Sequence, residues 1–534
     1  MSWCQRVRSY PQNIYQKLSC QNGGSFCNRD CRRKQGSAFE SRRVNLALKR
    51  FTSQASTTMT VRTEKNIFRS HDLAIDFFSW RDGLNKNIAF TFTPFGIAGA
   101  VLLDGVGYAG ELLLRNDFDV VAFKSSKNLW YQNLSQETIA AVGQFIAARA
   151  KPYGKRVGYG SSMGGYAAIQ FSRSLKLDVV LAISPQFEID KSYDQRWQAV
   201  AKLIDFQHRI DSSTIAVDCK YFVAYDPGTI DLHHVEKFRE LIGKGKLVEI
   251  PTPYSGHPAG QYLAETGLIQ DLVLSVLKNG TVEHIAVSKH RRRSKTYLYE
   301  LSKRLASQNK HKSALIAIDK AITIESNVPV FHLQRSVVLD KLNLREAALL
   351  AIDKAITIDS DAPELLLHRS IVLNNLGQRE TALIEIDKAI SINSDAPEFH
   401  LHRSIVLDNL DQPAAALDAA YEARRKLKYE AQLMGALSDR LARHRDFAGA
   451  LSLVEQAISI DDSVLQFHLH RCAVYKALGD IPAAISAGEY ALKLSPQNAP
   501  LMARLARLHA KRGGMAHWAR SLVLAKMAIF ARFS

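Results

Sequence analysis

Residues 155–172 read KRVGYGSSMGGYAAIQFS, and this stretch decides the fold of the region around it. A β-type run ends near Tyr159, the turn Gly160-Ser161-Ser162-Met163-Gly164 follows, and small residues at helical spacing come next. The pattern predicts a strand, a sharp turn and a helix, with Gly160 and Gly164 giving the two elements room to close. Such a turn strains the backbone of Ser162 and lifts its hydroxyl above the sheet, where it is placed as a nucleophile.

Strand-forming runs alternate with helical patterns on both sides of this turn. Helical patterns cover residues 135–150 and 164–175, among others. The alternation predicts a largely parallel sheet with helices on both faces. The expected strands are residues 88–92, 119–123, 156–159, 178–183, 221–225 and 246–250.

A serine nucleophile requires a base and an acid that orients it. His257 stands in a Gly-His-Pro turn after the last expected strand. Asp226, at a strand end, is the favoured acid, and Asp231, which begins a helix and has capping as its other role, is the alternative. The order serine, aspartate, histidine predicts acyl transfer through a covalent intermediate. His233 and His234 are expected to be surface or capping residues.

The remaining site residues are assigned from their position relative to the strands. The amide of Met163 at the helix N-terminus and a backbone amide of Phe95 or Gly96, after an early strand, are expected to bind an oxyanion. Trp130 and Tyr131 either line the mouth of the site and stack on a sugar, or anchor a packed loop. The dinucleotide, P-loop and H-E-x-x-H motifs are absent, so no cofactor or metal is expected.

This region resembles the α/β-hydrolase superfamily over about 220 residues. The strings that carry the resemblance are GYGSSMGGYAA, NLWYQ, SPQFEID, YDP and GHP. More narrowly, it is similar to hydrolase-like proteins encoded with bacterial surface-polysaccharide and glycosyltransferase genes, which often carry appended repeats. The resemblance implies an esterase, deacylase or acyltransferase acting on a glycan ester. A non-catalytic scaffold in bacterial surface-polysaccharide assembly is the alternative.

The second half of the chain repeats with a period of about 34 residues, a length typical of paired-helix repeats. AIDKAITIES, AIDKAITIDS and EIDKAISINS begin at residues 317, 351 and 385. Small residues recur in phase with these strings, which indicates antiparallel helix pairs in close contact. One phase contains Ala314, Ala348, Ala382, Ala416, Ala450 and Ala484, and a second contains Ala321, Ala355, Ala389, Ala423, Ala457, Ala491 and Ala525.

Residues 293–534 therefore resemble a tetratricopeptide-repeat solenoid of about seven units, which implies a protein partner. The chain departs from that pattern by placing arginines before the small residue of each first helix, with histidines nearby. Two interpretations remain open: a basic groove for an acidic peptide or polyanionic glycan, or internal pairing with the acids of the second helices. The arginines are Arg335, Arg369, Arg403 and Arg471, and the acids are Asp319, Asp353, Asp387, Glu455 and Glu489.

Charge and cysteine content are uneven along the 534 residues. Residues 1–58 hold eleven basic and two acidic residues, a net +9, and the other 476 residues carry 59 basic and 50 acidic residues, also +9. The body is thus only mildly basic, which does not favour nucleic-acid binding. Four of the six cysteines lie in residues 1–58, and the scattered pair beyond indicates a reducing compartment such as the cytoplasm.

The predicted organisation has three parts. Residues 1–58 form a basic, disordered extension, residues 59–285 form an α/β-hydrolase-like domain, and residues 293–534 form the repeat array. No apolar run is long enough to predict a membrane span.

Overall fold

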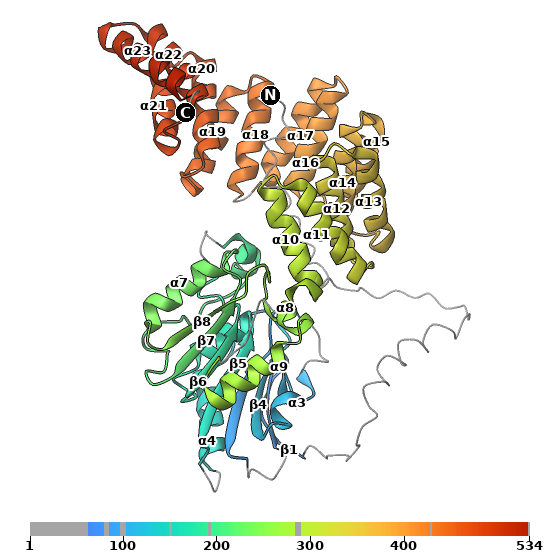
Figure 1. Ribbon diagram of the computed structural model, residues 1–534, viewed down its shortest axis with the longest axis vertical. Coiled ribbons are helices and arrows are strands. Elements are labelled where there is room, and N and C mark those ends of the chain that lie inside the picture. The colour runs from blue at the N-terminus through green and yellow to red at the C-terminus, as the bar shows by residue number, and fades with distance from the viewer. Residues whose placement is uncertain are drawn as a thin grey trace, which may run out of the picture. The chain divides into compact units, whose positions relative to one another are not determined.

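The computed structural model describes residues 62–79, 85–96, 103–148, 152–190, 194–282, 290–427 and 430–531. The predicted extension of residues 1–58, with its four cysteines, lies outside these ranges. The described chain divides into two units. We call the part up to Arg304, with Thr323–Glu325, the sheet unit, and the rest from Leu305 onward the repeat unit (Figure 1).

The sheet unit is built on an eight-stranded sheet with the order β1-β2-β4-β3-β5-β6-β7-β8. From β4 to β8 every neighbouring pair is parallel, and β2 and β1 join the β4 edge in antiparallel register. A mostly parallel sheet was predicted and is present. The strands are β1 (Arg62–Arg69), β2 (Leu73–Ser79), β3 (Asn87–Phe92), β4 (Phe118–Ser125), β5 (Lys155–Ser161), β6 (Val179–Ile183), β7 (Lys220–Tyr225) and β8 (Leu247–Pro251).

Helices cover both faces of this sheet, as the alternating sequence pattern requires. Helices α4 (Gln136–Ala147), α5 (Met163–Gln170) and α7 (Asp231–Ile242) share one apolar cluster with Val121 and Phe123 of β4. Side chains alternate along a strand, so the neighbouring residues of β4 point to the other face, where α3 (Gly110–Leu114) packs. The sheet unit also contains α6 (Gln198–Ala201), α8 (Gly260–Glu265), α9 (Ile269–Leu274) and α10 (Lys295–Ser307) up to Arg304.

Helix α10 is bound to the rest of the sheet unit by side-chain contacts. The carboxylate of Glu265 accepts hydrogen bonds from the hydroxyls of Ser294, at 2.5 Å, and Thr296, at 2.8 Å. Arg304 donates to the carbonyl of Gly228 at 2.7 Å. The first helix that the repeat pattern predicts therefore packs within the sheet unit.

The repeat unit is all helical and consists of tetratricopeptide-like antiparallel pairs, from α12/α13 to α22/α23, preceded by α11 (Figure 1). The alanines predicted to lie at helix contacts are buried from Ala314 to Ala491. The bounds are α11 (His311–Ile324), α12 (Pro329–Lys341), α13 (Arg345–Ile358), α14 (Pro363–Asn375), α15 (Arg379–Ile392), α16 (Pro397–Asn409), α17 (Pro413–Lys426), α18 (Ala431–Arg443), α19 (Phe447–Ile460), α20 (Leu465–Leu478), α21 (Ile481–Leu494), α22 (Ala499–Arg512) and α23 (Met515–Phe530).

The repeated arginines are paired inside the array. Each contacts an acid on the helix that comes directly before its own in the chain. The Nε atoms of three of them lie 2.7 Å from an aspartate oxygen, and the fourth contact is 3.2 Å long. The pairs are Arg335–Asp319, Arg369–Asp353, Arg403–Asp387 and Arg471–Glu455. These contacts show internal pairing. They neutralise the arginines that would have to line a basic groove.

The histidines of the repeats form a second set of internal contacts. His368 Nε2 lies 3.1 Å from Ser336 Oγ, whose hydroxyl donates to the carbonyl of Ala348 at 2.7 Å. Because the serine proton is already used, the histidine must carry its proton on Nε2 and donate it. His402 makes the same contact with Ser370 in the next repeat. Each contact joins one pair to the preceding pair.

The stability of the repeat unit is expected to fall as the pH drops below neutral. Burial lowers the pKa of His368 to about 4 and that of His402 to about 3, helped by Lys341 and Arg440 respectively. Between these values and the ordinary 6.5, the unfolded chain binds more protons than the folded chain. The free energy of unfolding should therefore decrease by about 2 kcal/mol per histidine between pH 7 and pH 5.

Urea denaturation of the full chain, followed by helical circular dichroism at several pH values, measures this effect. His402→Gln keeps a donor for Ser370 and should remove roughly half of the pH dependence. His71→Gln, at an exposed histidine, serves as the control. An unchanged slope in His402→Gln would show that this histidine does not resist protonation.

Candidate functional site

The turn after β5 has the backbone geometry that the sequence predicts. Ser162 has φ 51° and ψ −118°, a strained conformation for a residue with a side chain. A Cβ on Gly160 would lie 2.2 Å from the backbone of Gly164, and one on Gly164 would lie 2.4 Å from the carbonyl oxygen of Phe92. Both positions therefore require glycine, and Ser162 is fixed between β5 and the start of α5.

Ser162, His257 and Asp231 form a continuous hydrogen-bonded chain at the carboxyl ends of the parallel strands. Ser162 Oγ lies 3.1 Å from His257 Nε2. His257 Nδ1 lies 2.9 and 3.0 Å from the two oxygens of Asp231. A carboxylate only accepts, so His257 carries its proton on Nδ1 and leaves the Nε2 lone pair facing the serine. The arrangement can move a proton from Ser162 to His257.

Asp226, the favoured acid, does not contact His257, whereas the alternative Asp231 does. Its Oδ1 accepts the backbone N–H of Gly228 and its Oδ2 accepts that of Gly256, each at 2.9 Å. Both oxygens are therefore used to hold the loop before His257 against the end of β7. Asp231, one turn further along at the start of α7, points its carboxylate at the imidazole instead.

A buried ionic network keeps Asp231 charged. Burial raises the pKa of Asp231, but His257 and Arg196 outweigh it and lower the pKa to about 2. Arg196 Nη1 lies 2.9 Å from Asp231, and Nη2 of the same guanidinium lies 2.8 Å from Asp194. His234 Nε2 lies 2.8 Å from Asp194. His234 is also fully buried. This corrects the prediction that it is a surface or capping residue.

Gln186, which follows β6, contacts both the nucleophile and the base. Its Nε2 lies 3.0 Å from Ser162 Oγ and 3.1 Å from His257 Nε2. The indole of Trp130 donates to Gln186 Oε1 at 3.3 Å. Since an indole nitrogen only donates, it fixes which end of the amide faces it, and the amide hydrogens must face Ser162 and His257.

The two aromatic residues predicted at the mouth of the site are buried. Trp130 is 1% exposed and Tyr131 is 0% exposed, so neither presents a face to a sugar in this structure. Tyr131 donates to the carbonyls of Thr93 and Phe123 and anchors its loop. Both residues have positive φ, 48° and 54°, so packing holds a strained segment in place. Of the two interpretations, the anchor of a packed loop fits both residues.

A cluster of aromatic rings covers the hydrogen-bonded residues Ser162, His257 and Asp231. Trp130 and Trp197 have ring centroids 5.1 Å apart, and Phe95 lies 5.3 Å from Trp130 and 4.8 Å from Trp197. Trp197 also contacts the His257 ring at 5.9 Å. Ser162 is only 4% exposed as a result. Low-dielectric surroundings of this kind strengthen the polar contacts beneath them.

The predicted oxyanion donors differ in the hydrogen bonds that their backbone amides make. Met163 begins α5, so its amide is one of the N–H groups that have no partner within the helix. The Gly96 amide already donates to Asn128 Oδ1 at 3.1 Å and is not free for an oxyanion. The ring of Phe95 belongs to the aromatic cover.

Sequence reasoning missed Gln186, Arg196 and Trp197. Gln186 had a usable signal, because polar residues just after parallel strands gather at one sheet edge and β6 neighbours the nucleophile strand. Arg196 and Trp197 lie in a short 3₁₀ helix (Gln195–Trp197) between β6 and β7, and no spacing connects them to the site.

Two kinds of feature are absent from the described residues. No group of histidine, cysteine, aspartate or glutamate side chains there has a metal-binding arrangement. In that part of the chain, no helix combines the length and the apolar character needed to cross a bilayer.

Comparisons with known proteins concern the fold only. No protein-family model and no curated protein matches the chain. Among solved structures, it is similar to YrrB, a TPR protein described as having an unusual peptide-binding site, at 21% identity and a TM-score of 0.27 over 37% of this chain and 98% of that one. Pseudomonas aeruginosa PilF matches at 17% identity and a TM-score of 0.31 over 38% and 92% of the two chains. A TPR protein of Thermus thermophilus matches at 19% identity and a TM-score of 0.30 over 34% and 98%.

Proposed function

We propose that the sheet unit is a serine hydrolase that cleaves or transfers an acyl ester, with Ser162 as nucleophile. The observation that carries the proposal is the contact chain from Ser162 through His257 to Asp231 on a strained strand–helix turn. A strained serine, a base with its lone pair toward that serine, and an oriented acid are the three parts that nucleophilic catalysis requires.

The first step forms an acyl-enzyme. His257 Nε2 takes the proton of Ser162 as Oγ attacks the ester carbonyl, and Asp231 stabilises the imidazolium through Nδ1. The carbonyl electron pair moves onto its oxygen, which the Met163 amide binds. The ester bond then breaks, and the leaving alcohol takes the proton from His257. Water or a sugar hydroxyl repeats the sequence and releases the acyl group.

Gln186 supplies a further hydrogen bond during this proton transfer. In the resting site, Gln186 Nε2 lies within hydrogen-bond distance of both Ser162 Oγ and His257 Nε2, which share one amide hydrogen, and it lies 3.4 Å from the carbonyl oxygen of Ser184. Once Nε2 is protonated it no longer accepts, so the shared amide hydrogen is available to Ser162 Oγ alone. The bond to Oγ favours the oxygen as negative charge develops on it.

Gln186→Leu is therefore expected to lower kcat/KM for an aryl ester by roughly 100-fold, with most of the loss in kcat. Gln170→Leu is the matched control, because Gln170 is also a buried glutamine but lies at the far end of α5. Steady-state hydrolysis of p-nitrophenyl esters measures both variants. A faster Gln186→Leu enzyme would mean that the amide blocks the base.

The substrate class comes from the resemblance and not from the site. The GYGSSMGGYAA and SPQFEID strings point to a glycan ester, and the repeat unit would recruit a protein partner. Pre-steady-state hydrolysis of p-nitrophenyl esters of increasing acyl length tests the reaction class. A burst of p-nitrophenol equal to the enzyme concentration is expected, and no turnover with any ester would contradict the proposal.

One observation favours a second function. Ser162 is almost fully covered by Gln186 and the aromatic rings, so the sheet unit presents no open nucleophile in this structure. A non-catalytic scaffold in bacterial surface-polysaccharide assembly would have this property. Such a scaffold tolerates Ser162→Ala without loss of function.

A further inference from the structure

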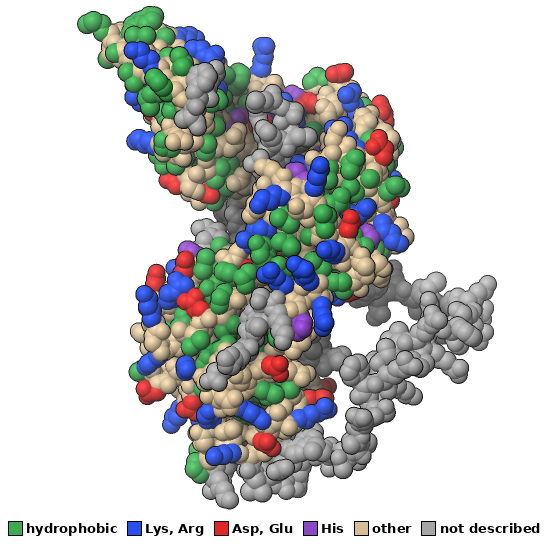
Figure 2. Space-filling model, viewed as in Figure 1, with side chains coloured by type: hydrophobic (Ala, Val, Ile, Leu, Met, Phe, Trp, Pro, Cys, Tyr) green, Lys and Arg blue, Asp and Glu red, His purple; other side chains and the backbone are tan. Residues whose placement is uncertain are grey.

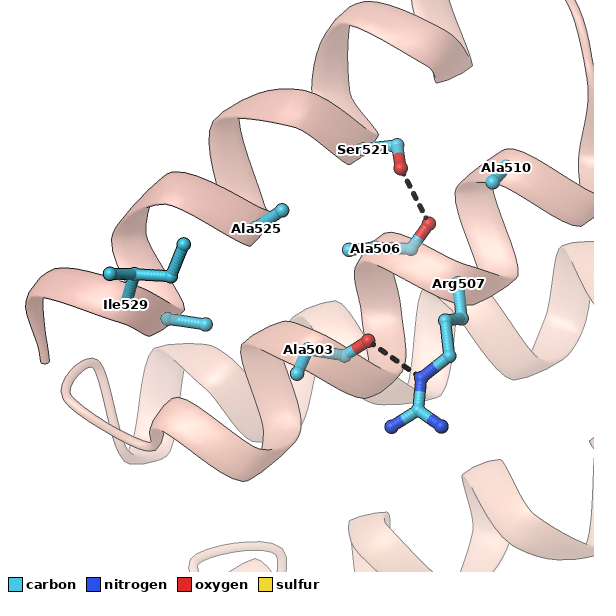
Figure 3. Close-up of a pocket in the computed structure, with 8 residues that line it drawn as sticks. Ala503, Ala506, Arg507, Ala510, Ser521, Ala525 and Ile529 are labelled. Atoms are coloured by element: carbon cyan, nitrogen blue, oxygen red, sulfur yellow. Dashed lines mark hydrogen bonds between the residues drawn. The ribbon is translucent and has the colours of Figure 1, made fainter. Parts of the chain in front are cut away.

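The last helix pair of the repeat unit leaves a groove uncovered. The groove lies between α22 and α23, has a volume of about 370 Å³, and is shown in Figure 3. Its lining is mostly small: Ala503, Ala506, Arg507, Ala510, Ser521, Ala525, Ala528 and Ile529. Alanines at a helix contact let a further helix approach closely.

Earlier helix pairs show which side chains of the next helix normally cover such a surface. Between α20/α21 and α22/α23, Leu501 and Leu505 of α22 share one buried apolar cluster with Ala487 and Ala491 of α21. Ala525 is in the same repeat phase as Ala491, but it is only half-buried and lines the groove. Within the described residues no helix follows α23 to cover it. The position is shaped for one more helix.

The helix beside this groove exposes an unusual amount of apolar surface. Met515 is 92% exposed and Phe530 is 76% exposed. Large side chains exposed on α23 are Met515, Trp518, Leu522, Val523, Met527, Ile529 and Phe530. A patch of this kind on a stable chain marks an interaction surface. Figure 2 shows hydrophobic and basic side chains together over this end of the array.

The charge around the groove selects the occupant. Residues 499–531 contain no aspartate or glutamate. Arg507 lines the groove and Lys526 is exposed on α23, whereas Arg520 is paired with Glu489 of α21. A second copy would bring two basic faces together, which is unfavourable. A lipid surface would need a convex apolar face, whereas the alanines form the floor of a groove. An amphipathic helix with acidic flanks satisfies both the shape and the charge.

We propose that the groove between α22 and α23 binds an acidic amphipathic helix of a protein partner, which completes the array as an added helix. The proposal rests on the proposed role of the repeats in recruiting a protein, and it is independent of the hydrolase. The apolar side of the bound helix would lie on Ala503, Ala525 and Leu522, and its acidic flanks would face Arg507 and Lys526.

A fluorescent peptide of about 18 residues tests this, with leucines at helical spacing, glutamates elsewhere and one photoreactive benzophenone. Anisotropy with the full chain should show binding, and the cross-links should map to α22 and α23. Leu522→Glu, at an exposed position, is expected to weaken binding at least about tenfold without changing the helical circular dichroism.

The matched control distinguishes this groove from a second pocket nearby. Lys476, with Leu469 and Arg504, lines a different pocket between α20 and α22. Lys476→Glu should leave peptide binding unchanged. Loss of binding in Lys476→Glu but not in Leu522→Glu would overturn the proposal, although the repeats would still bind protein.

Three other results would also overturn it. No binding of the acidic peptide by the full chain would remove the charge argument. Sedimentation with phosphatidylglycerol vesicles that Leu522→Glu abolishes, without peptide binding, would assign the surface to lipid. Concentration-dependent dimerisation that Leu522→Glu abolishes, again without peptide binding, would assign it to a second copy.

Discussion

Asp231→Asn is expected to lower kcat/KM for ester hydrolysis by about 10⁴-fold while the fold is kept. An asparagine oriented by Arg196 presents its oxygen to the guanidinium and its NH₂ to the imidazole, because Arg196 only donates. His257 Nδ1 must then accept, which moves its proton to Nε2 and removes the lone pair that Ser162 needs. The loss therefore comes from the wrong tautomer. Steady-state kinetics with an aryl ester measures it.

Asp226→Asn is the matched control for this prediction. Its two carboxylate oxygens hold the amides of Gly228 and Gly256, so the substitution removes one of these bonds and lowers the melting temperature. The activity of the folded protein should stay within about tenfold of wild type. A large loss in Asp226→Asn with an active Asp231→Asn enzyme would reverse the assignment of the acid.

Ser162→Ala is expected to remove the covalent pathway and to lower turnover by roughly 10⁴-fold or more. The melting temperature should change little, because alanine keeps the Cβ and the strained backbone is held by the glycines on either side. Ser161→Ala is the neighbouring control, since Ser161 is the last residue of β5 and is also buried. Hydrolysis that persists at the wild-type rate in Ser162→Ala would contradict the proposed nucleophile.

Local and periodic features could be predicted from the sequence. The turn around Ser162 was predictable because two glycines and a serine at fixed spacing have few backbone solutions. The helix pairs were predictable because the same contact recurs in every repeat, so each alanine supports the others. The parallel sheet followed from the alternation of runs, although the antiparallel strands β1 and β2 were not predicted.

The contacts between distant loops could not be predicted. Asp226 and Asp231 are close in the chain, and either one fits the order serine, aspartate, histidine. Only the folded loop before His257 shows that Asp226 is used by backbone amides. Trp130 was assigned to the mouth of the site from its position after a strand end, but its indole is buried against Gln186, which lies far along the chain after another strand. His234 was read as a surface residue because its partner, Asp194, lies on another loop.

Labelling with a fluorophosphonate probe, followed by mass-spectrometric mapping of the adduct, tests the central claim most directly. The probe requires an activated serine but no knowledge of the substrate. The account predicts one adduct on Ser162 in the wild-type chain, strongly reduced in His257→Ala and absent in Ser162→Ala. Folded wild-type protein that carries no adduct at Ser162, at probe concentrations that label known serine hydrolases, would contradict it and favour the scaffold.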